Sequence, residues 1–417
     1  MKLPLPRGIR DIPPDVYREY LWLLDVFKET CRLYNFKIME PATIEYFEVL
    51  SKKSGPDIAK EIYEFKDKAG RHLGLRFDLT VGLTRYVVSN PQLSKPIKLA
   101  AFSVQWRYDE PQYGRYRSFY AWDIEIYGAE EKYSAVETIS FTIDFLSSLG
   151  LRKFKVLISD RRLVEQCIRL VNENVDAITI MRILDKWGKL SKNEILETLV
   201  KNGKLDYSEA EELIRWLFIE KGIKDELLDK YAENLIAVHD MLREIGYNNV
   251  VIDPSIIRGL DYYDGIVFEV KSEADPSLGS IVGGGNYSTL VKLFGGDFNA
   301  FGAAGGVERT ILAMKAEKID VDITEKPDIF IAVTSPSMVI EAFKLGSILR
   351  RNRIKTYTPL KIMSLNKQIK HAIKTEARYI LFIGEEEIRQ KKYTLKNLTT
   401  RKEYKYSLDE ILNIFKK

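Results

Sequence analysis

Residues 102–128 read FSVQWRYDEPQYGRYRSFYAWDIEIYG, and their alternation predicts a β-hairpin with one apolar face and one charged face. Successive side chains of a strand point to opposite faces of a sheet. The apolar face would hold Phe102, Val104, Trp106, Tyr120, Trp122, Ile124 and Ile126. The other face would hold Gln105, Arg107, Asp109, Phe119, Ala121, Asp123, Glu125 and Tyr127. Arginines and paired acids flanked by aromatic residues differ from an ordinary solvated face rich in Lys and Glu, so this hairpin is predicted to form a site.

The composition is that of a globular protein with more than one domain. The chain has 417 residues, of which 45% are hydrophobic and 30% charged, and a single core rarely grows to this size. No run approaches the roughly 18 apolar residues of a membrane span, and the N-terminus lacks the apolar core of a signal peptide. Cys31 and Cys167 are expected to be buried free thiols. We therefore expect a cytoplasmic protein with no membrane partner.

The charge is unevenly distributed along the chain. Residues 327–417 carry 19 Lys and Arg against 9 Asp and Glu, a balance of +10, whereas the rest of the chain has a balance of −6. A basic C-terminal domain on an acidic body favours contact with a polyanion. A merely solvated, lysine-rich surface is the alternative.

The expected elements divide the chain into four segments, 1–158, 159–246, 247–322 and 327–417. The first and third combine helices with hairpins, which predicts an α+β body with a mixed, mainly antiparallel sheet. The second is almost wholly helical in pattern and reads as an insertion. The fourth alternates apolar strands with helices, which predicts a small α/β domain with a largely parallel sheet.

Within the body, a strand over 71–80 would place Arg76, Asp78 and Thr80 on one face. The glycine clusters at 283–285 and 302–306 are typical of turns or tight packing rather than of phosphate-binding loops.

Several arginine-bearing segments are predicted to converge on the sheet of the body; they contain Arg76, Arg107, Arg258 and Arg309. Buried arginines need anionic partners, and the guanidinium group suits bidentate contact with phosphate or carboxylate. A structural Arg–Asp network is the alternative, but four such segments favour a triphosphate or a similarly charged ligand. Neither familiar glycine-rich nucleotide motif is present. If ATP binds, arginine side chains on an antiparallel sheet must hold it.

Several of these segments resemble the motifs of a known family. The hairpin pattern from Arg107 to Arg117 resembles motif 2 of class II aminoacyl-tRNA synthetases, Gly305–Arg309 resembles their motif 3, and Pro41 stands where motif 1 has its proline. The segment 258–263, Arg-Gly-Leu-Asp-Tyr-Tyr, looks like a signature of histidyl-tRNA synthetases. Leu75–Thr80 resembles the archaeal and eukaryotic form of that family's amino-acid loop. The resemblance runs from Arg7 to the C-terminus.

The resemblance implies a class II catalytic body with a helical insertion and an anticodon-binding domain. It implies activation of histidine with ATP and Mg²⁺, transfer to tRNA(His), and a homodimer. The implied catalytic residues are Arg107 and Arg258, and the ATP-binding residues are Arg107, Asp109, Arg115 and Arg309. Histidine would contact Asp78, Thr80, Glu125, Arg258, Tyr262 and Tyr263. Gln112 and Arg117 would meet the tRNA acceptor end, and no fixed protein metal site is implied.

Some positions depart from the family pattern. Ala121 stands where a glutamine usually helps to bind the α-amino group, and Asn286 and Ser288 replace an Arg and an Asp. Ser118 and Gly82 also differ from the usual residues. A divergent but active synthetase is the favoured interpretation, because the arginines, Asp78, Glu125 and Tyr263 are all present. The alternatives are a non-catalytic tRNA- or histidine-sensing paralogue and a phosphoribosyltransferase regulatory subunit, against which the basic C-terminal domain argues.

Overall fold

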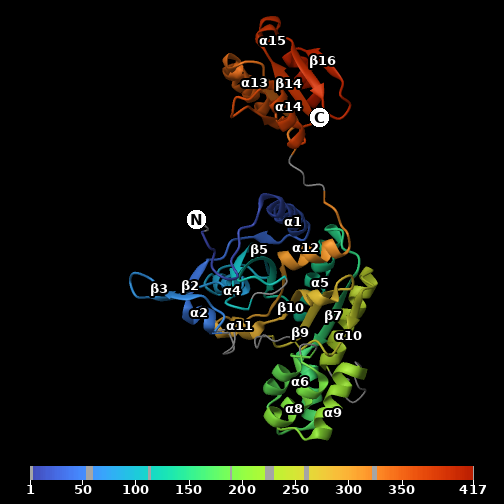
Figure 1. Cartoon of the computed structure of the whole chain (residues 1–417). Coiled ribbons are helices and arrows are strands. Elements are labelled where there is room, and N and C mark those ends of the chain that lie inside the picture. Colours follow the sequence, from blue (N-terminus) through green and yellow to red (C-terminus); the bar gives the residue numbers. More distant parts are fainter. Residues whose placement is uncertain are drawn as a thin grey trace. The chain divides into compact units, whose positions relative to one another are not determined.

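The computed structural model describes residues 3–52, 60–110, 114–187, 190–220, 230–257, 263–321 and 326–416. The chain forms two compact units, Met1–Val321 and Asp322–Lys417. Figure 1 colours the first from blue to orange and the second in orange and red. Among the helices described, none is long and apolar enough to cross a membrane.

The first unit is built on an eight-stranded sheet of order β1-β5-β6-β11-β10-β9-β7-β8. Its six central strands pair antiparallel, whereas β1 and β8 at the two edges pair parallel with their neighbours. In sheet order the strands are β1 Lys37–Ile38, β5 Ile97–Trp106, β6 Ser118–Tyr127, β11 Ala300–Gly306, β10 Ser280–Asn286, β9 Ile266–Ser272, β7 Phe154–Asp160 and β8 Val250–Ile252. The expectation of a mixed, mainly antiparallel sheet is confirmed.

The hairpin has the predicted alternation. Trp122 and Ile124 of β6 are fully buried on the face that packs against the long helices. That apolar layer draws its side chains from α1 Pro14–Leu33, α5 Glu131–Ser148, α10 Lys230–Ile245 and α12 Val307–Ala316. The opposite face of the same strands is partly covered by α4 Thr80–Val88 and α11 Ser288–Leu293, whose apolar residues form a second core.

A small antiparallel sheet and a helical segment complete the first unit. The small sheet is β2 Ile44–Tyr46, β4 His72–Leu75 and β3 Glu64–Lys66, and the short helix α2 Phe47–Ser51 follows β2. The helices with a core of their own lie side by side (Figure 1) and are α6 Arg161–Val171, α7 Ala177–Leu184, α8 Lys192–Gly203, α9 Tyr207–Ile214 and the π-helix η1 Arg215–Glu220. By contrast, α10 packs on the helix α5 and on the strands β7 and β8 of the large sheet. A short 3-10 helix, η3, spans Pro276–Leu278.

The second unit has a five-stranded sheet of order β13-β12-β14-β15-β16, with helices on both faces. The strands are β13 Thr356–Tyr357, β12 Ile329–Val333, β14 Tyr379–Ile383, β15 Tyr393–Asn397 and β16 Glu403–Tyr406. The helices are η4 Pro336–Met338, α13 Val339–Arg351, α14 Leu365–Lys374, α15 Glu385–Gln390 and α16 Leu408–Phe415. The three strands β13, β12 and β14 are parallel, but β15 and β16 pair antiparallel, so the sheet is mixed rather than largely parallel.

Of the turns or tight packing expected at the glycines of 283–285 and 302–306, tight packing is confirmed. These glycines belong to the adjacent central strands β10 and β11, where a Cβ atom at residue 284 or 302 would overlap neighbouring atoms. The expectation for residues 71–80 is wrong. The strand expected over 71–80 ends at Leu75, and Thr80 begins α4. Arg76 therefore does not share a strand face with Asp78 and Thr80.

Arg76 serves a structural role instead. Its guanidinium is buried, donates to the carbonyl oxygens of Pro41 and Val104 at 2.6 and 2.9 Å, and pairs with Glu40 at 2.6 Å. These contacts join the chain after β1 to β5.

Candidate active site

The polar face of β6 carries two carboxylates, and three of the four residues paired with them across the sheet are small. Asp123 pairs across the sheet with Ala101 and Ala304, and Glu125 pairs with Leu99 and Gly302. A Cβ atom at residue 302 would lie 1.5 Å from the Oε2 atom of Glu125. Glycine at this position therefore creates the space that the Glu125 side chain occupies.

Glu125 is held by a buried phenol. It is 1% exposed, and its carboxylate accepts a hydrogen bond of 2.5 Å from the hydroxyl of Tyr287, which follows β10. Burial, and then the charge of Glu125, raises the pKa of Tyr287 well above its ordinary value. The phenol consequently stays protonated and acts as a donor to the carboxylate.

Asp78 and Thr80 lie beside Asp123. The Oδ1 atom of Asp78 accepts from the backbone N–H of Val81 at 2.9 Å, which caps the first turn of α4. The hydroxyl of Thr80 donates to the Oδ2 atom of Asp123 at 3.2 Å. Burial, and then the charges of Glu125 and Asp78, raises the pKa of Asp123 well above its ordinary value. Three carboxylates thus gather on one side of the site.

Three arginines form the other side. Arg309, at the start of α12, donates to the carbonyl oxygen of Ser280 at 2.9 Å. Burial lowers the pKa of Arg309, and the neighbouring charges of Arg115 and Arg107 lower it further. Arg107 donates through Nε to the carbonyl oxygen of Phe77 at 2.9 Å and lies 5.4 Å from the centre of the Phe119 ring. Like charges held together in this way favour a polyanionic ligand.

The remaining described candidates border these two groups. Asp109 pairs with Arg115 at 3.6 Å, and both side chains are partly exposed. Arg117 is 7% exposed, donates to the carbonyl oxygen of Asp109 at 2.9 Å and lies 3.9 Å from the centre of the Tyr108 ring. Tyr263 is buried in the core that also contains Tyr287. Gln112, Arg258 and Tyr262 lie outside the residues that the structure describes.

Sequence reasoning assigned no role to three residues that the geometry brings into the site: Asp123, Tyr287 and Gly302. The alternation of the hairpin already placed Asp123 beside Glu125, so a signal for it existed. No signal identified Tyr287 or Gly302, because their contact with Glu125 depends on the order of β6, β11 and β10 in the sheet.

The positions that depart from the family pattern are accommodated locally. Ala121 is buried and pairs with Ser103 and Gly306. The side-chain oxygen of Asn286 accepts from the backbone N–H and the hydroxyl of Ser288 at 2.9 and 2.7 Å. This pair orders the start of α11 without the Arg and Asp found elsewhere.

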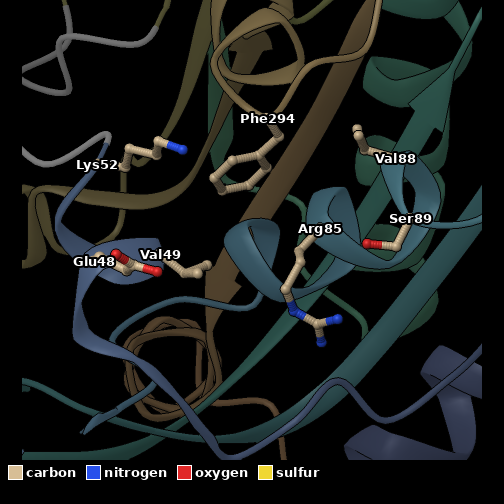
Figure 2. Close-up of a pocket in the computed structure, with 7 residues that line it drawn as sticks. All are labelled: Glu48, Val49, Lys52, Arg85, Val88, Ser89 and Phe294. Carbon is tan, nitrogen blue, oxygen red and sulfur yellow. The ribbon is translucent and has the colours of Figure 1, made fainter. Parts of the chain in front are cut away.

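A separate cavity of about 130 Å³ lies between α2, α4 and Phe294. Figure 2 shows its seven lining side chains, with those of Glu48 and Val49 on one wall and those of Arg85 and Val88 on another. None of the residues that line it belongs to the candidate site. Among the described residues, no group of His, Cys, Asp and Glu is arranged to hold a metal ion.

Comparisons with known proteins point to the same family along nearly the whole chain. The sequence model of the histidyl-tRNA synthetase family matches residues 8–310, and that of the anticodon binding domain matches residues 328–417. The chain is 32% identical to the histidine–tRNA ligase of Pyrococcus furiosus, covering 98% of both chains. It is 32% identical to the histidine–tRNA ligase of Pyrobaculum islandicum, covering 97% of this chain and 96% of the relative.

Solved structures show the same fold. The crystal structure of apo S. aureus histidyl-tRNA synthetase superposes with a TM-score of 0.78 at 25% identity and full coverage of both chains. The family model spans most of the chain, and the relatives are 32% identical over nearly their full length. The chain therefore belongs to the histidyl-tRNA synthetase family.

Proposed function

We propose that this chain is an ATP-dependent histidine–tRNA ligase, which activates histidine to histidyl-adenylate and transfers it to the 3′ end of tRNA(His). The observation that carries the proposal is the meeting of three arginines with a buried group of carboxylates on one sheet face. Arg107 donates to the carbonyl oxygen of Phe77, the residue that precedes Asp78, so the two sides of the site adjoin each other. An amino acid cation and a triphosphate would meet at that junction.

Activation requires in-line attack of the histidine carboxylate on the α-phosphate of ATP. Two anions must approach each other, so positioning and charge neutralisation matter more than an acid–base pair. We assign Arg107 and Arg258 to the reacting carboxylate and α-phosphate. Arg115 and Arg309 would hold the outer phosphates, and Asp109 would accept from the adenine amino group. The contact of Arg309 with the Ser280 carbonyl supports this placement, because it fixes the guanidinium beside the floor of the site.

Recognition of the substrate side chain falls to Glu125, with Tyr263 and Tyr262. Glu125 already accepts from Tyr287, so its orientation is fixed before the substrate arrives. An imidazole N–H would donate to the same carboxylate. A site with such a buried acceptor rejects amino acids that have no matching donor. Asp78 and Thr80 would take the α-ammonium group.

Mg²⁺ would enter with ATP, where it neutralises phosphate charge. Glu269 supplies a carboxylate near Arg309: it accepts from the hydroxyl of Ser280, and the carbonyl oxygen of the same serine accepts from Arg309. Mg²⁺ prefers oxygen ligands and usually keeps waters and phosphate oxygens, so one protein carboxylate suits it.

We assign tRNA contact to both units. Gln112 and Arg117 in the hairpin loop would face the acceptor end. The burial of Arg117 and its contact with the Asp109 carbonyl favour an action through the shape of that loop. Residues 327–417 of the second unit, with their balance of +10, would bind the anticodon arm. We place the protein in the cytoplasm, where tRNA charging occurs.

We further propose a homodimer that uses the small sheet of the body. Ile44, Tyr46 and Phe65 share one face with Leu73 and Leu75, since they pair directly across the strands. Ile44 and Tyr46 are each 48% exposed and Phe65 is 39% exposed. A contiguous apolar face of this kind is typical of a protein–protein contact.

The test of the proposed function is ATP–pyrophosphate exchange measured with each of the twenty amino acids. We expect exchange with histidine alone and its loss in Arg107→Ala. Arg309→Gln should raise the KM for ATP by about tenfold, the cost of one charge-assisted contact. Arg32→Gln is the control, because that exposed arginine pairs with Glu29 within α1. A folded protein that binds tRNA but exchanges with no amino acid would favour a non-catalytic paralogue.

A further inference from the structure

Two buried carboxylate oxygens in the candidate site have no hydrogen-bond partner among the described residues. They are Oδ2 of Asp78 and Oδ1 of Asp123. The two residues are 7% and 0% exposed. Buried acceptors of this kind destabilise the folded protein unless a donor reaches them. A ligand that brings donors and positive charge is therefore expected at this point.

The other oxygen of each carboxylate is already engaged. Asp78 uses Oδ1 to cap α4 through the Val81 N–H at 2.9 Å. Asp123 uses Oδ2 to accept from Thr80 at 3.2 Å. Because the Thr80 hydroxyl donates its proton to Asp123, its oxygen keeps lone pairs that can accept a hydrogen bond. Asp78, Thr80 and Asp123 thus offer three acceptors in one place.

The α-ammonium group of an amino acid carries three N–H donors, which matches this number. Residue 121, two positions before Asp123 on β6, is alanine and offers no side-chain acceptor. We propose that Asp123 accepts a hydrogen bond from the α-ammonium group of the bound amino acid; this inference rests on the proposed function.

Charge and geometry both favour the ammonium over the imidazole as the partner of Asp123. Glu125 is tied to Tyr287 on the side of β11 and β10, whereas Asp123 is tied to Thr80 at the start of α4. Glu125 and Asp78 add negative charge beside Asp123, and Arg107 is the neighbouring cation that acts on it. An ammonium cation between Asp78 and Asp123 offsets their mutual repulsion.

The test compares two ligands that differ only in the group concerned. Histidine and 3-(imidazol-4-yl)propionate, which lacks the α-amino group, are titrated calorimetrically against the full-length protein. We expect Asp123→Ala to weaken histidine binding about tenfold or more. Binding of the des-amino ligand should stay unchanged or become tighter. Asp123→Asn retains an uncharged acceptor, so its ratio of the two affinities should fall between those of the wild type and Asp123→Ala.

Glu125→Gln is the matched control, because both ligands carry the imidazole and both should bind more weakly. Equal weakening of the two ligands in Asp123→Ala, or no change in either, would overturn the inference. If Asp123→Ala does not fold, a ratio in Asp123→Asn equal to that of the wild type would do the same. Failure of the wild-type protein to bind histidine or to support exchange would instead contradict the proposed function.

Discussion

At residue 302 the absence of a side chain decides whether the carboxylate of Glu125 can occupy its position. A methyl group there would overlap Oε2 of Glu125, since the two atoms would be 1.5 Å apart. The neighbouring Gly306 is different, because the nearest atom to a Cβ there is 4.0 Å away. The two glycines of β11 thus differ in the space around them: a side chain is excluded at residue 302 but not at residue 306.

This difference predicts the behaviour of two alanine variants. Gly302→Ala should raise the KM for histidine by about tenfold or more, because Glu125 must move away from Tyr287. The KM for ATP should change little. Gly306→Ala, the control, should leave both constants near those of the wild type. Steady-state exchange kinetics measure both, and equal behaviour of the two variants would contradict the assigned position of Glu125.

Because Asp123 is buried, we expect its carboxylate to lower the stability of the free protein while it contributes to ligand binding. Its pKa in the folded protein is raised above the ordinary value of 3.8, so ionisation of this group destabilises the folded state at neutral pH. Stability from such a group is present below the unfolded pKa and is lost as the pH rises through the folded pKa. Asp123→Asn should therefore unfold at a higher urea concentration than the wild type at pH 7.

The extra stability of Asp123→Asn against urea should shrink as the pH falls towards 4, because the aspartate of the wild type is then increasingly protonated in both the folded and the unfolded state. Urea unfolding of the two proteins across this pH range measures it. A gain that is independent of pH, or a loss at pH 7, would show that the Asp123 carboxylate is not disfavoured in the free protein.

At the scale of elements, alternation in the hairpin was a sufficient signal because each strand has one buried face. Trp122 and Ile124 belong to the core and Asp123 and Glu125 to the site, as period two requires. The same signal failed in β10 and β11, where glycines make room for the side chains of neighbouring strands. It also failed after Leu75, where the chain leaves the strand and Asp78 accepts from the backbone N–H of Val81 in the first turn of α4.

Much of the candidate site was predictable because it lies on one hairpin, which contains Arg107, Asp109 and Arg115. Arg309, at the start of α12, was identified from the separate segment Gly305–Arg309, and the structure brings it close to Arg107 and Arg115. The part contributed by Tyr287 was not predictable, since that residue lies 162 positions from Glu125 and reaches it only through the sheet order. Strand order is a property of the whole sheet, which local patterns do not contain.

The small sheet β2-β4-β3 offers a prediction at this same scale. Replacing both Ile44 and Tyr46 with glutamate should yield a monomer, because charge on an apolar contact face opposes association. Light scattering coupled to gel filtration measures the mass. Tyr207→Glu is the control, because Tyr207 is 59% exposed on α9, away from this sheet. A wild-type monomer, or a dimer that survives both changes, would contradict the proposed contact face.

At the scale of the whole molecule, the net positive charge lies in the second unit and the net negative charge in the first. Residues 327–417 of the second unit carry a balance of +10. Three of its lysines, Lys367, Lys370 and Lys374, are exposed on α14 at helical spacing. Such a stripe suits the phosphates of an RNA backbone.

Replacing these three lysines with glutamine should weaken tRNA binding and flatten its dependence on salt. Removing one lysine–phosphate interaction reduces the slope of log Kd against log salt by somewhat less than one. Filter binding at several salt concentrations measures the slope. The corresponding changes at Lys28 and Lys155, which pair with Asp25 and Glu273, should leave it unaltered. An unchanged slope in the triple variant would place the tRNA elsewhere.

The most direct test of the proposed function is the charging of a tRNA(His) transcript by the full-length protein with ATP and labelled histidine. We expect histidine to become attached to this tRNA and not to transcripts of other specificity, and Arg258→Ala to abolish the reaction. Binding of histidine and tRNA without any charging, under conditions in which a known histidine–tRNA ligase is active, would contradict the proposal and favour a non-catalytic member of the family.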